Sequence, residues 1–413
     1  MWKQDCALLK LSAFFVAYET QIPKTINQNT LPMEITERDI LRLLLACMVA
    51  LYVKSNLPNM RRSSTMRDSS TTTTISTVDD DTAVNIFYPA PSKRQMLVKS
   101  DKLLFNVPRL DFAIVTDLDK SSRDPNKFLW RSYFKRGGIV RKPGSDKFVV
   151  EWSNVTVLET KFAYGNRSME LSELVRYDHL LLAVCDITGL VFKIRKKDGA
   201  IFQRWALADG DGEKAKPFKA EWATVKDGML WLGSTGKEWT TLDGRTIEHR
   251  NPEWVKTIDR NGRVKNYDFG PIYQAMRTAT NTTFPGYLWH EAVHFDSMHR
   301  RWIFLPRKES KERYNPDNDE YMGTNLLITT AEDFSDMKFH RLGPKEKEWG
   351  FSSVRKIPGS NNLYVALKVR EVKNETATKM TVFDLDGTFH IDPPFVNVDG
   401  FMKYEGLAFI DYE

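Results

Sequence analysis

The stretch MELSELV at residues 169–175 decides the fold, because weaker copies of it return at four later points in the chain. These copies are AEWATV (220–225), HEAVHF (290–295), FSSVRKI (351–357) and YEGLAFI (404–410). Four of the five segments have glutamate in the second position, and the remaining one has Ser352. Successive second positions lie 51, 70, 61 and 53 residues apart. A recurrence at this spacing predicts a repeat architecture.

Each interval holds short runs rich in Val, Ile, Phe, Trp and Tyr, separated by Gly, Asp, Asn and Pro, which is typical of strands and turns. After Glu170 the runs are ELVRY (173–177), LLLAVCD (180–186), GLVFKI (189–194) and AIFQRWAL (200–207). Four antiparallel strands joined by short turns make one blade of a β-propeller. Only residues 273–279 have a pattern that favours a helix.

The last repeat ends the chain after a single strand, so its blade needs three strands from elsewhere. The N-terminal runs at 111–119, 129–142 and 147–161 can supply them. Pairing the C-terminal strand with these N-terminal strands closes the ring and removes an open sheet edge. The sequence therefore predicts an all-β, five-bladed β-propeller closed in this way.

Composition bounds the partners and the compartment. The net charge of +6 is small for 413 residues and no long Lys/Arg block occurs, so we expect no nucleic-acid partner. Of the three cysteines only Cys185 lies in the expected folded part, which leaves no intramolecular disulfide there. Four Asn-X-Ser/Thr triplets instead favour the secretory pathway. They begin at Asn154, Asn166, Asn281 and Asn374.

The first 84 residues contain a targeting segment and a stem in our interpretation. The run LLLACMVALYV (43–53) is too short for a confident membrane span and suits a signal peptide or signal anchor after Arg42. A buried helix is the alternative, and Met33 is a candidate second start. A Ser/Thr-rich stretch then lacks the apolar residues of a core. We therefore expect a targeting segment over 1–62, a stem over 63–84 and the propeller over 85–413. The protein should reside in the ER or Golgi lumen, with or without a membrane anchor, or be secreted.

The recurrent second position indicates a metal site. The first strand of each propeller blade lines the central channel, so the repeat brings four glutamates and a serine toward one end of it. These residues are Glu170, Glu221, Glu291, Ser352 and Glu405. Crowded carboxylates repel one another unless a cation lies among them, and a set of oxygen ligands favours calcium over zinc. The alternative is that the glutamates are ordinary exposed turn residues.

The ends of the second strands should reach the same face of the propeller. They carry the candidate catalytic acids Asp117, Asp119 and Asp186, which can orient or deprotonate water. They also carry candidate substrate-binding residues: Lys237, Glu238, Trp239 and Arg307. Basic side chains can neutralise phosphate, and Trp239 can stack on a base. The alternatives are that the two N-terminal aspartates cap turns and that Trp239 packs within a strand.

From about Leu110 to the C-terminus, the chain resembles the calcium-activated nucleotidases, or soluble apyrases. The motifs that carry the resemblance are DLDKSSR (117–123), MELSEL (169–174), DITG (186–189), DGDG (209–212), FKAEWATVKDG (218–228), GKEWTT (236–241), NPEWVK (251–256), PGYLWHEA (285–292), RRWIFLPRKES (300–310), GFSS (350–353) and KYEG (403–406). These motifs are long and follow one another in order. The first hundred residues lie outside the resemblance.

The resemblance implies a five-bladed propeller with calcium in its channel and particular ligands. The implied ligands are Ser172, Glu221, Glu291, Ser352 and Glu405. In the first repeat the ligand is thus Ser172, two residues beyond Glu170, which becomes a carboxylate that either faces the substrate or supports the metal ligands. Arg123 is a further candidate substrate-binding residue. The family often has two consecutive acids before the Thr-Gly of DITG, whereas this chain has Cys185 before Asp186.

The implied reaction is calcium-dependent hydrolysis of nucleoside diphosphates such as UDP and GDP, with ADP and ATP as a wider substrate set. Calcium would offset phosphate charge while an acidic side chain orients the attacking water. A monomer or weak homodimer is expected. Two other functions stay open: a non-catalytic propeller that binds a ligand, and a propeller hydrolase that acts on a lactone or glycan.

Overall fold

The structure, a computed structural model, describes residues 109–410. The expected targeting segment with its apolar run at 43–53, the stem at 63–84 and the expected domain start at 85 lie outside the described residues. Within 109–410, no helix combines the length and the apolar character that crossing a bilayer requires.

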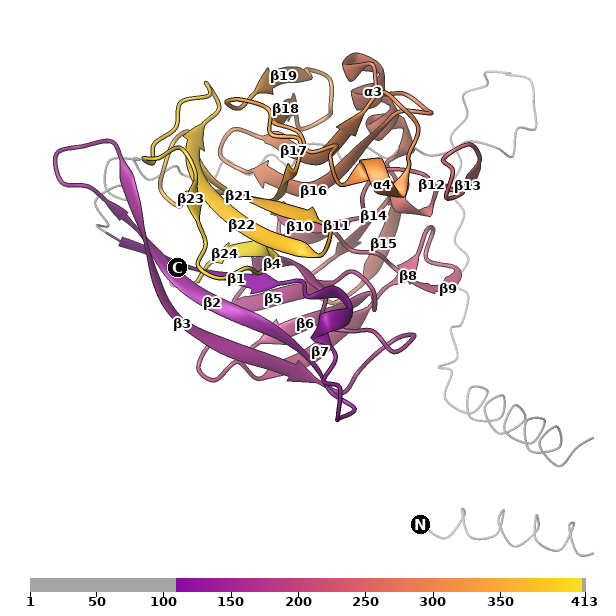
Figure 1. Cartoon of the computed structure of the whole chain (residues 1–413), viewed down its shortest axis with the longest axis horizontal. Coiled ribbons are helices and arrows are strands. Elements are labelled where there is room, and N and C mark those ends of the chain that lie inside the picture. The colour runs from indigo at the N-terminus through magenta and orange to yellow at the C-terminus, as the bar shows by residue number, and fades with distance from the viewer. Residues whose placement is uncertain (1–108, 411–413) are drawn as a thin grey trace, which may run out of the picture. The chain divides into compact units, whose positions relative to one another are not determined.

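The described strands form five four-stranded antiparallel sheets, and this confirms the predicted all-β five-bladed propeller (Figure 1). Blade I consists of β24 (Tyr404–Phe409), β1 (Arg109–Thr116), β2 (Trp130–Arg141) and β3 (Phe148–Thr160). Blade II consists of β4 (Leu171–Tyr177), β5 (Leu180–Cys185), β6 (Leu190–Ile194) and β7 (Ile201–Ala206). Blade III consists of β10 (Trp222–Lys226), β11 (Met229–Gly233), β14 (Trp254–Ile258) and β15 (Val264–Asp268).

The remaining two blades follow the same order. Blade IV consists of β16 (Tyr287–Asp296), β17 (Arg301–Ser310), β18 (Leu326–Ala331) and β19 (Lys338–Arg341). Blade V consists of β20 (Trp349–Lys356), β21 (Leu363–Val372), β22 (Glu375–Asp384) and β23 (Val396–Asn397). The first strands β4, β10, β16, β20 and β24 contact one another in sequence around the ring, so they are the innermost strands.

The ring closes where the two ends of the described chain meet. The yellow C-terminal strand β24 lies beside the indigo strand β1 in Figure 1, and the two pair antiparallel with Ala113 opposite Ala408. Gly406 lets β24 approach the next blade closely, because a Cβ at this position would lie 2.5 Å from the backbone nitrogen of Leu174. The predicted closure by C-terminal and N-terminal strands is therefore confirmed.

Insertions between strands account for the unequal repeat lengths. Blade III and the connection that follows it contain the hairpin β12 (Trp239–Thr240) with β13 (Ile247–His249), the turn η3 (Asn251–Glu253) and helix α3 (Gly270–Thr280). The hairpin β8 (Ala208–Asp209) with β9 (Lys214–Pro217) precedes this blade, and the turn η2 (Asp119–Ser122) follows β1. Helix α3 contains the predicted helical residues 273–279.

A second helix, α4 (Pro316–Asp319), corrects the expectation of a single helix. The Asn315 side chain caps it by accepting hydrogen bonds from the backbone N–H groups of Asp317 and Asn318, and Pro316 occupies its first position. Asn as the cap and Pro at the first position are a local start signal. Four residues were too short for a hydrophobic period to show.

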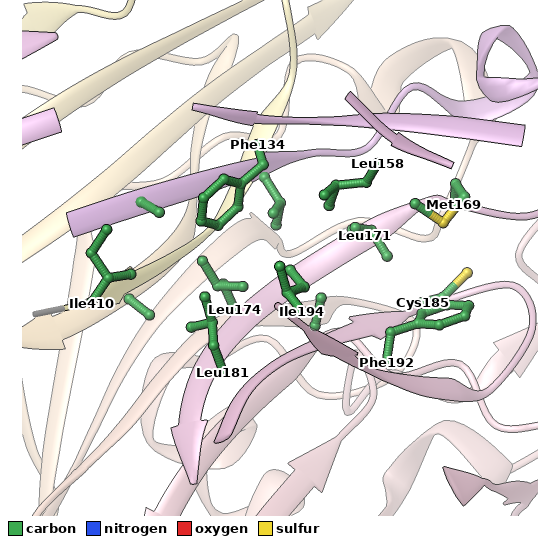
Figure 2. Packing of buried hydrophobic residues seen from close by; sticks show 14 of the residues in the cluster. Phe134, Leu158, Met169, Leu171, Leu174, Leu181, Cys185, Phe192, Ile194 and Ile410 are labelled. Atoms are coloured by element: carbon green, nitrogen blue, oxygen red, sulfur yellow. The ribbon is translucent and has the colours of Figure 1, made fainter. Parts of the chain in front are cut away.

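The hydrophobic core consists of five clusters, each between neighbouring blades. Between blades I and II, Phe134 and Leu158 pack against Leu171, Leu174 and other apolar side chains (Figure 2). Close packing on both faces of every inner strand holds the strand ends in fixed positions. The side chains at the starts of these strands are therefore positioned by the whole ring.

Candidate active site

The innermost strands share a β-bulge at the position of the predicted metal ligands. On β4 the residues Leu171 and Glu173 pair with consecutive residues of β5, so Ser172 is skipped. Glu291 on β16, Ser352 on β20 and Glu405 on β24 are skipped in the same way. A bulge leaves its extra residue outside the ladder and redirects its side chain.

Blade III reaches a similar arrangement at the very start of β10. Glu221 precedes Trp222, which pairs with Gly233, and the Glu221 N–H donates to the carbonyl oxygen of that same glycine at 2.8 Å. Two residues of the inner strand thus face one residue of its neighbour. The five inner strands bring the implied ligands to corresponding places, with Ser172 rather than Glu170 in the skipped position.

All five of these side chains are buried, with relative exposures between 0% and 4%. The interpretation of the glutamates as ordinary exposed turn residues is therefore wrong for this chain. The hydroxyl oxygens of Ser172 and Ser352 have no hydrogen-bond partner, although a buried hydroxyl normally has one. Three carboxylates and two free hydroxyl oxygens are a donor set that suits a hard cation such as calcium.

Arg307 lies among the acids of this ring. It is also skipped in the ladder, since Pro306 and Lys308 pair with the consecutive residues His290 and Trp289. Its Nη1 lies 2.8 Å from Glu291 and 2.8 Å from Glu405, and its Nη2 donates to Glu371 at 2.9 Å. The predicted substrate-side arginine thus joins two ring carboxylates to an acid farther out.

Two lysines that the sequence reasoning missed also contact the ring. Lys219 pairs with Asp186 and, at 2.6 Å, with Glu221. Lys403 lies 2.9 Å from Asp117, 2.7 Å from Asp119 and 3.8 Å from Glu405. Each lysine stands two positions before a ring glutamate, in FKAEW and KYEG. This repeated Lys-X-Glu spacing was a signal that could have revealed both.

The three predicted catalytic acids come from the ends of two second strands. Asp117 and Asp119 follow β1, and Asp186 follows β5, whose end is tied to the adjoining strand by a hydrogen bond from the Asp186 N–H to the Glu170 carbonyl at 3.1 Å. Asp117 also accepts a hydrogen bond from the Asp119 N–H at 2.8 Å. It therefore caps a local turn, as one alternative suggested, and contacts Lys403 as well.

Burial among like charges perturbs the protonation of this region. Burial, opposed by the hydrogen bond from Arg167 and reinforced by the charges of Asp186 and Asp117, raises the pKa of Glu170 to about 8. Burial likewise raises the pKa of Asp186 to about 7 and that of Glu291 to about 7, despite the nearby cations Lys219 and Arg307. Bound cations would stabilise the ionised forms of these carboxyls.

The GKEW loop places its residues on different partners. Lys237 is buried between the rings of Tyr287 and Tyr314, with its Nζ 5.6 and 4.7 Å from their centroids, and burial lowers its pKa. Glu238 forms a buried ion pair with Arg277 of α3, so the structure places it in the support of the loop. Within residues 109–410, Lys237 and Glu238 form no ion pair with the ring acids.

Trp239 lies on the outer part of this loop and is 41% exposed. Its ring stacks with His249 at 6.0 Å, and Lys216 lies 4.8 Å from its centroid. Trp239 begins β12 and pairs with His249, so it belongs to the small β12–β13 hairpin and not to a blade. Arg123 is also exposed, at the end of η2 next to the acidic loop.

Cys185, the departure from the family pattern, faces the core. It is fully buried in the cluster with Phe192 and Met169, and burial raises the pKa of its thiol to about 12 (Figure 2). The side chain therefore packs as a small apolar residue. Its position gives no contact with the water or substrate side of the site.

Known proteins are similar to this chain in sequence. The family model described as Apyrase matches residues 118–410, which includes every predicted site residue except Asp117. The chain belongs to the apyrase family. Apyrase from Cimex lectularius is 39% identical over 308 residues, which cover 73% of this chain and 83% of that protein.

Other apyrase-family relatives agree with this assignment. Soluble calcium-activated nucleotidase 1 from Rattus norvegicus is 39% identical over 305 residues, covering 73% of this chain and 74% of that protein. Apyrase apy-1 from Caenorhabditis elegans is 36% identical over 319 residues, covering 74% and 88%. A glycoside hydrolase structure overlaps at a TM-score of 0.34 and 11% identity over 66% of this chain and 61% of that chain, too distantly to bear on function. The chain is therefore a nucleotide-hydrolysing enzyme of the apyrase family.

Proposed function

We propose that this apyrase-family chain hydrolyses the terminal phosphoanhydride of nucleoside diphosphates, UDP and GDP first and ADP or ATP less specifically, and that it requires calcium. The observation that carries the proposal is the buried ring of Ser172, Glu221, Glu291, Ser352 and Glu405 at matching positions of five inner strands. Two relatives are named as calcium-activated nucleotidases, which supports the same metal.

The ring residues would hold the ion through three carboxylates and two hydroxyl oxygens. When bound, calcium supplies positive charge that offsets the phosphate oxygens as charge develops in the transition state. Arg307, which is 10% exposed at its side chain, adds a fixed positive charge between the ring and Glu371. Lys237 adds another from its tyrosine pocket.

Asp186 is the best-placed general base. Its Oδ1 is buried without a hydrogen-bond partner, while Lys219 holds its other oxygen. Water attacks the terminal phosphorus, the bond to the bridging oxygen breaks, and the water proton passes to Oδ1 of Asp186. The products are a nucleoside monophosphate and phosphate. Asp117 and Asp119, held by Lys403, would orient the attacking water and a metal ion bound to the substrate phosphates.

The nucleobase of the substrate would stack on Trp239, beyond the phosphates, since this ring is the exposed aromatic on the GKEW loop. The carboxylate chemistry by itself could also serve glycan cleavage, and a propeller could bind a ligand without turnover. Family membership favours the nucleotidase over both of these functions.

The test is phosphate release from UDP, GDP, ADP and ATP by the full chain, in calcium and in EGTA. We expect release in calcium only, with the diphosphates preferred. Glu221→Gln should abolish it, whereas Glu213→Gln, a change on the exposed β8–β9 loop, should leave it intact. Full activity in EGTA, or in Glu221→Gln, would refute the role of calcium.

A location in the secretory pathway is part of the same proposal. All four asparagines of the Asn-X-Ser/Thr triplets are exposed in the structure, so each can accept a glycan. Glycosidase treatment of protein expressed in animal cells should lower its apparent mass, and N-terminal sequencing should find the chain beginning at or after Met33. A soluble form that retains residues 1–30 and carries no glycan would contradict this location.

A further inference from the structure

A second group of acids lies next to the predicted calcium ring. One oxygen each from Asp117, Asp119 and Glu170 lies within 4.8 Å of the other two. Three carboxylate oxygens of the described residues thus lie close enough together to share one metal ion. None of the three belongs to the ring. They come from the end of β1, the start of η2 and the residue before β4, so three separate backbone segments hold them together.

An independent feature beside this group points to a ligand. Oδ1 of Asp186 is buried and has no hydrogen-bond partner. The Asp186 N–H donates to the carbonyl oxygen of Glu170 at 3.1 Å, so Asp186 lies directly beside one member of the group. A buried carboxylate oxygen without a donor is costly unless a water or an ion satisfies it.

The charge balance leaves room for more than one divalent cation. Ion pairs connect eight carboxylates at this end of the channel with only four cationic side chains, Arg167, Lys219, Arg307 and Lys403. With all eight carboxylates ionised, the state that bound cations favour, one calcium ion in the ring would still leave an excess of negative charge. A nucleoside diphosphate brings about three further negative charges near neutral pH. Such a substrate would be repelled without further compensation.

The basic residues that now contact the group can make way. Arg167, which is 34% exposed at its side chain, pairs with Glu170 and lies 3.6 Å from Asp119. It can turn into solvent when a bound cation takes over the charge of Glu170, whose side chain is 0% exposed and needs a counter-ion. Lys403 is 4% exposed and lies 2.9 Å from Asp117 and 2.7 Å from Asp119, so it would stay and reduce the negative charge of the group.

We propose that Asp117, Asp119 and Glu170 bind a second hard divalent cation, which receives the nucleotide phosphates, and that a water on this ion donates to Oδ1 of Asp186. The inference deepens the proposed nucleotidase function and rests on it for the role of the ion. The binding itself needs no substrate. Three carboxylates with water completing the shell are ligands that calcium or manganese accepts.

The test counts ions on the full chain, without nucleotide, by equilibrium dialysis against calcium followed by metal analysis. The wild type should hold about two ions per chain and Asp119→Asn about one, while Glu221→Gln should lose the ring ion and keep the other. Asp211→Asn is the matched control, since Asp211 has a similarly exposed side chain (41% against 44%) in another loop on this face and should keep both.

Glu170→Gln provides a second variant of the same site, and thermal unfolding of each variant establishes that it folds. One ion per chain in the wild type, unchanged in Asp119→Asn and Glu170→Gln but lost in Glu221→Gln, would overturn the second site and leave the ring standing. One ion that disappears only in Asp119→Asn and Glu170→Gln would support the second site and contradict the ring.

Discussion

Glu291 and Glu405, on the innermost strands of different blades, share a single donor: Nη1 of Arg307 lies 2.8 Å from each carboxylate. The arginine therefore occupies the position of a counter-ion between two predicted calcium ligands. Buried carboxylates need such compensation, and a protein cation and a metal ion can both provide it.

Replacement of Arg307 by Met should make the fold depend on calcium. Without the guanidinium, the buried acids lose their protein counter-ion, so the free energy of unfolding should fall by about 3–5 kcal/mol in EGTA and by much less in saturating calcium. Calcium should bind more tightly, since no cation competes for the carboxylates. Urea unfolding with and without calcium measures both effects. Arg307→Lys is the control that keeps the charge, and an equal loss in both conditions would contradict the idea.

Two adjacent serines on β20 separate metal binding from stability. Ser352 is the skipped residue with an unpartnered hydroxyl, whereas Ser353 donates to both oxygens of the buried Glu173 at 2.9 and 3.2 Å. Ser352→Ala should raise the calcium concentration needed for half-maximal activity and leave calcium-free stability nearly unchanged. Ser353→Ala should cost about 1–3 kcal/mol of stability, because the buried carboxylate loses one of its hydrogen-bond donors while Arg355 and two backbone N–H groups remain. If both variants shift the calcium response equally, Ser352 has no special role as a ligand.

The fold could be predicted because it rests on patterns that sequence displays directly. Strand periodicity and the five-fold recurrence of one segment gave the blades, and the incomplete last repeat gave the closure of β24 on β1. The site was harder to predict than the fold. Four of the ligands lie in a β-bulge and Glu221 lies in a similar arrangement, so each adds one residue to an otherwise regular strand period. Aligning the repeats by their glutamates selected Glu170, while the family resemblance selected Ser172, which is the skipped residue.

Lys219 and Lys403, the two lysines that contact the ring acids, were not predicted for a different reason. Lys219 and Lys403 contact acids from distant parts of the chain, such as Asp186 and Asp117, and only the closed ring brings them together. Glu238 stands next to Lys237, a predicted substrate-binding residue, but it forms an ion pair with Arg277 of the later helix α3. The Lys-X-Glu spacing marks the two lysines, but no local pattern shows which distant acids they contact.

Glu309 should make the stability of blade IV depend on pH. Burial raises the pKa of this carboxyl, but the hydrogen bonds donated by Arg341 at 2.6 and 2.7 Å and by Thr324 outweigh it and lower the pKa to about 2. A lowered folded-state pKa stabilises the protein above the unfolded value of about 4.3, and this stabilisation is lost as the pH falls toward 2.

Comparison of the wild type with Glu309→Gln isolates this contribution. The stability difference should be about 1–2 kcal/mol at pH 6, since the half-exposed Arg341 weakens the pair, and should fall to about half of that near pH 3, because the folded-state pKa is about 2. Urea midpoints at both pH values measure it. Glu312→Gln, at an exposed neighbouring position, should show no such change. A difference that stays constant from pH 6 to pH 3 would rule out the linkage.

Trp239 and Leu242 provide a matched pair for base recognition, because both are exposed on the loop that carries β12 and β13. Trp239→Ala should raise KM with little effect on kcat, since stacking on a base contributes about 1–3 kcal/mol and acts before the chemical step, which corresponds to roughly 5- to 150-fold in KM. Leu242→Ala removes an 80% exposed side chain and should change neither constant. Steady-state kinetics with UDP and with inorganic pyrophosphate, which lacks a base, complete the test. The loss should appear with UDP alone; an equal loss with pyrophosphate would mean that Trp239 supports the phosphate site instead.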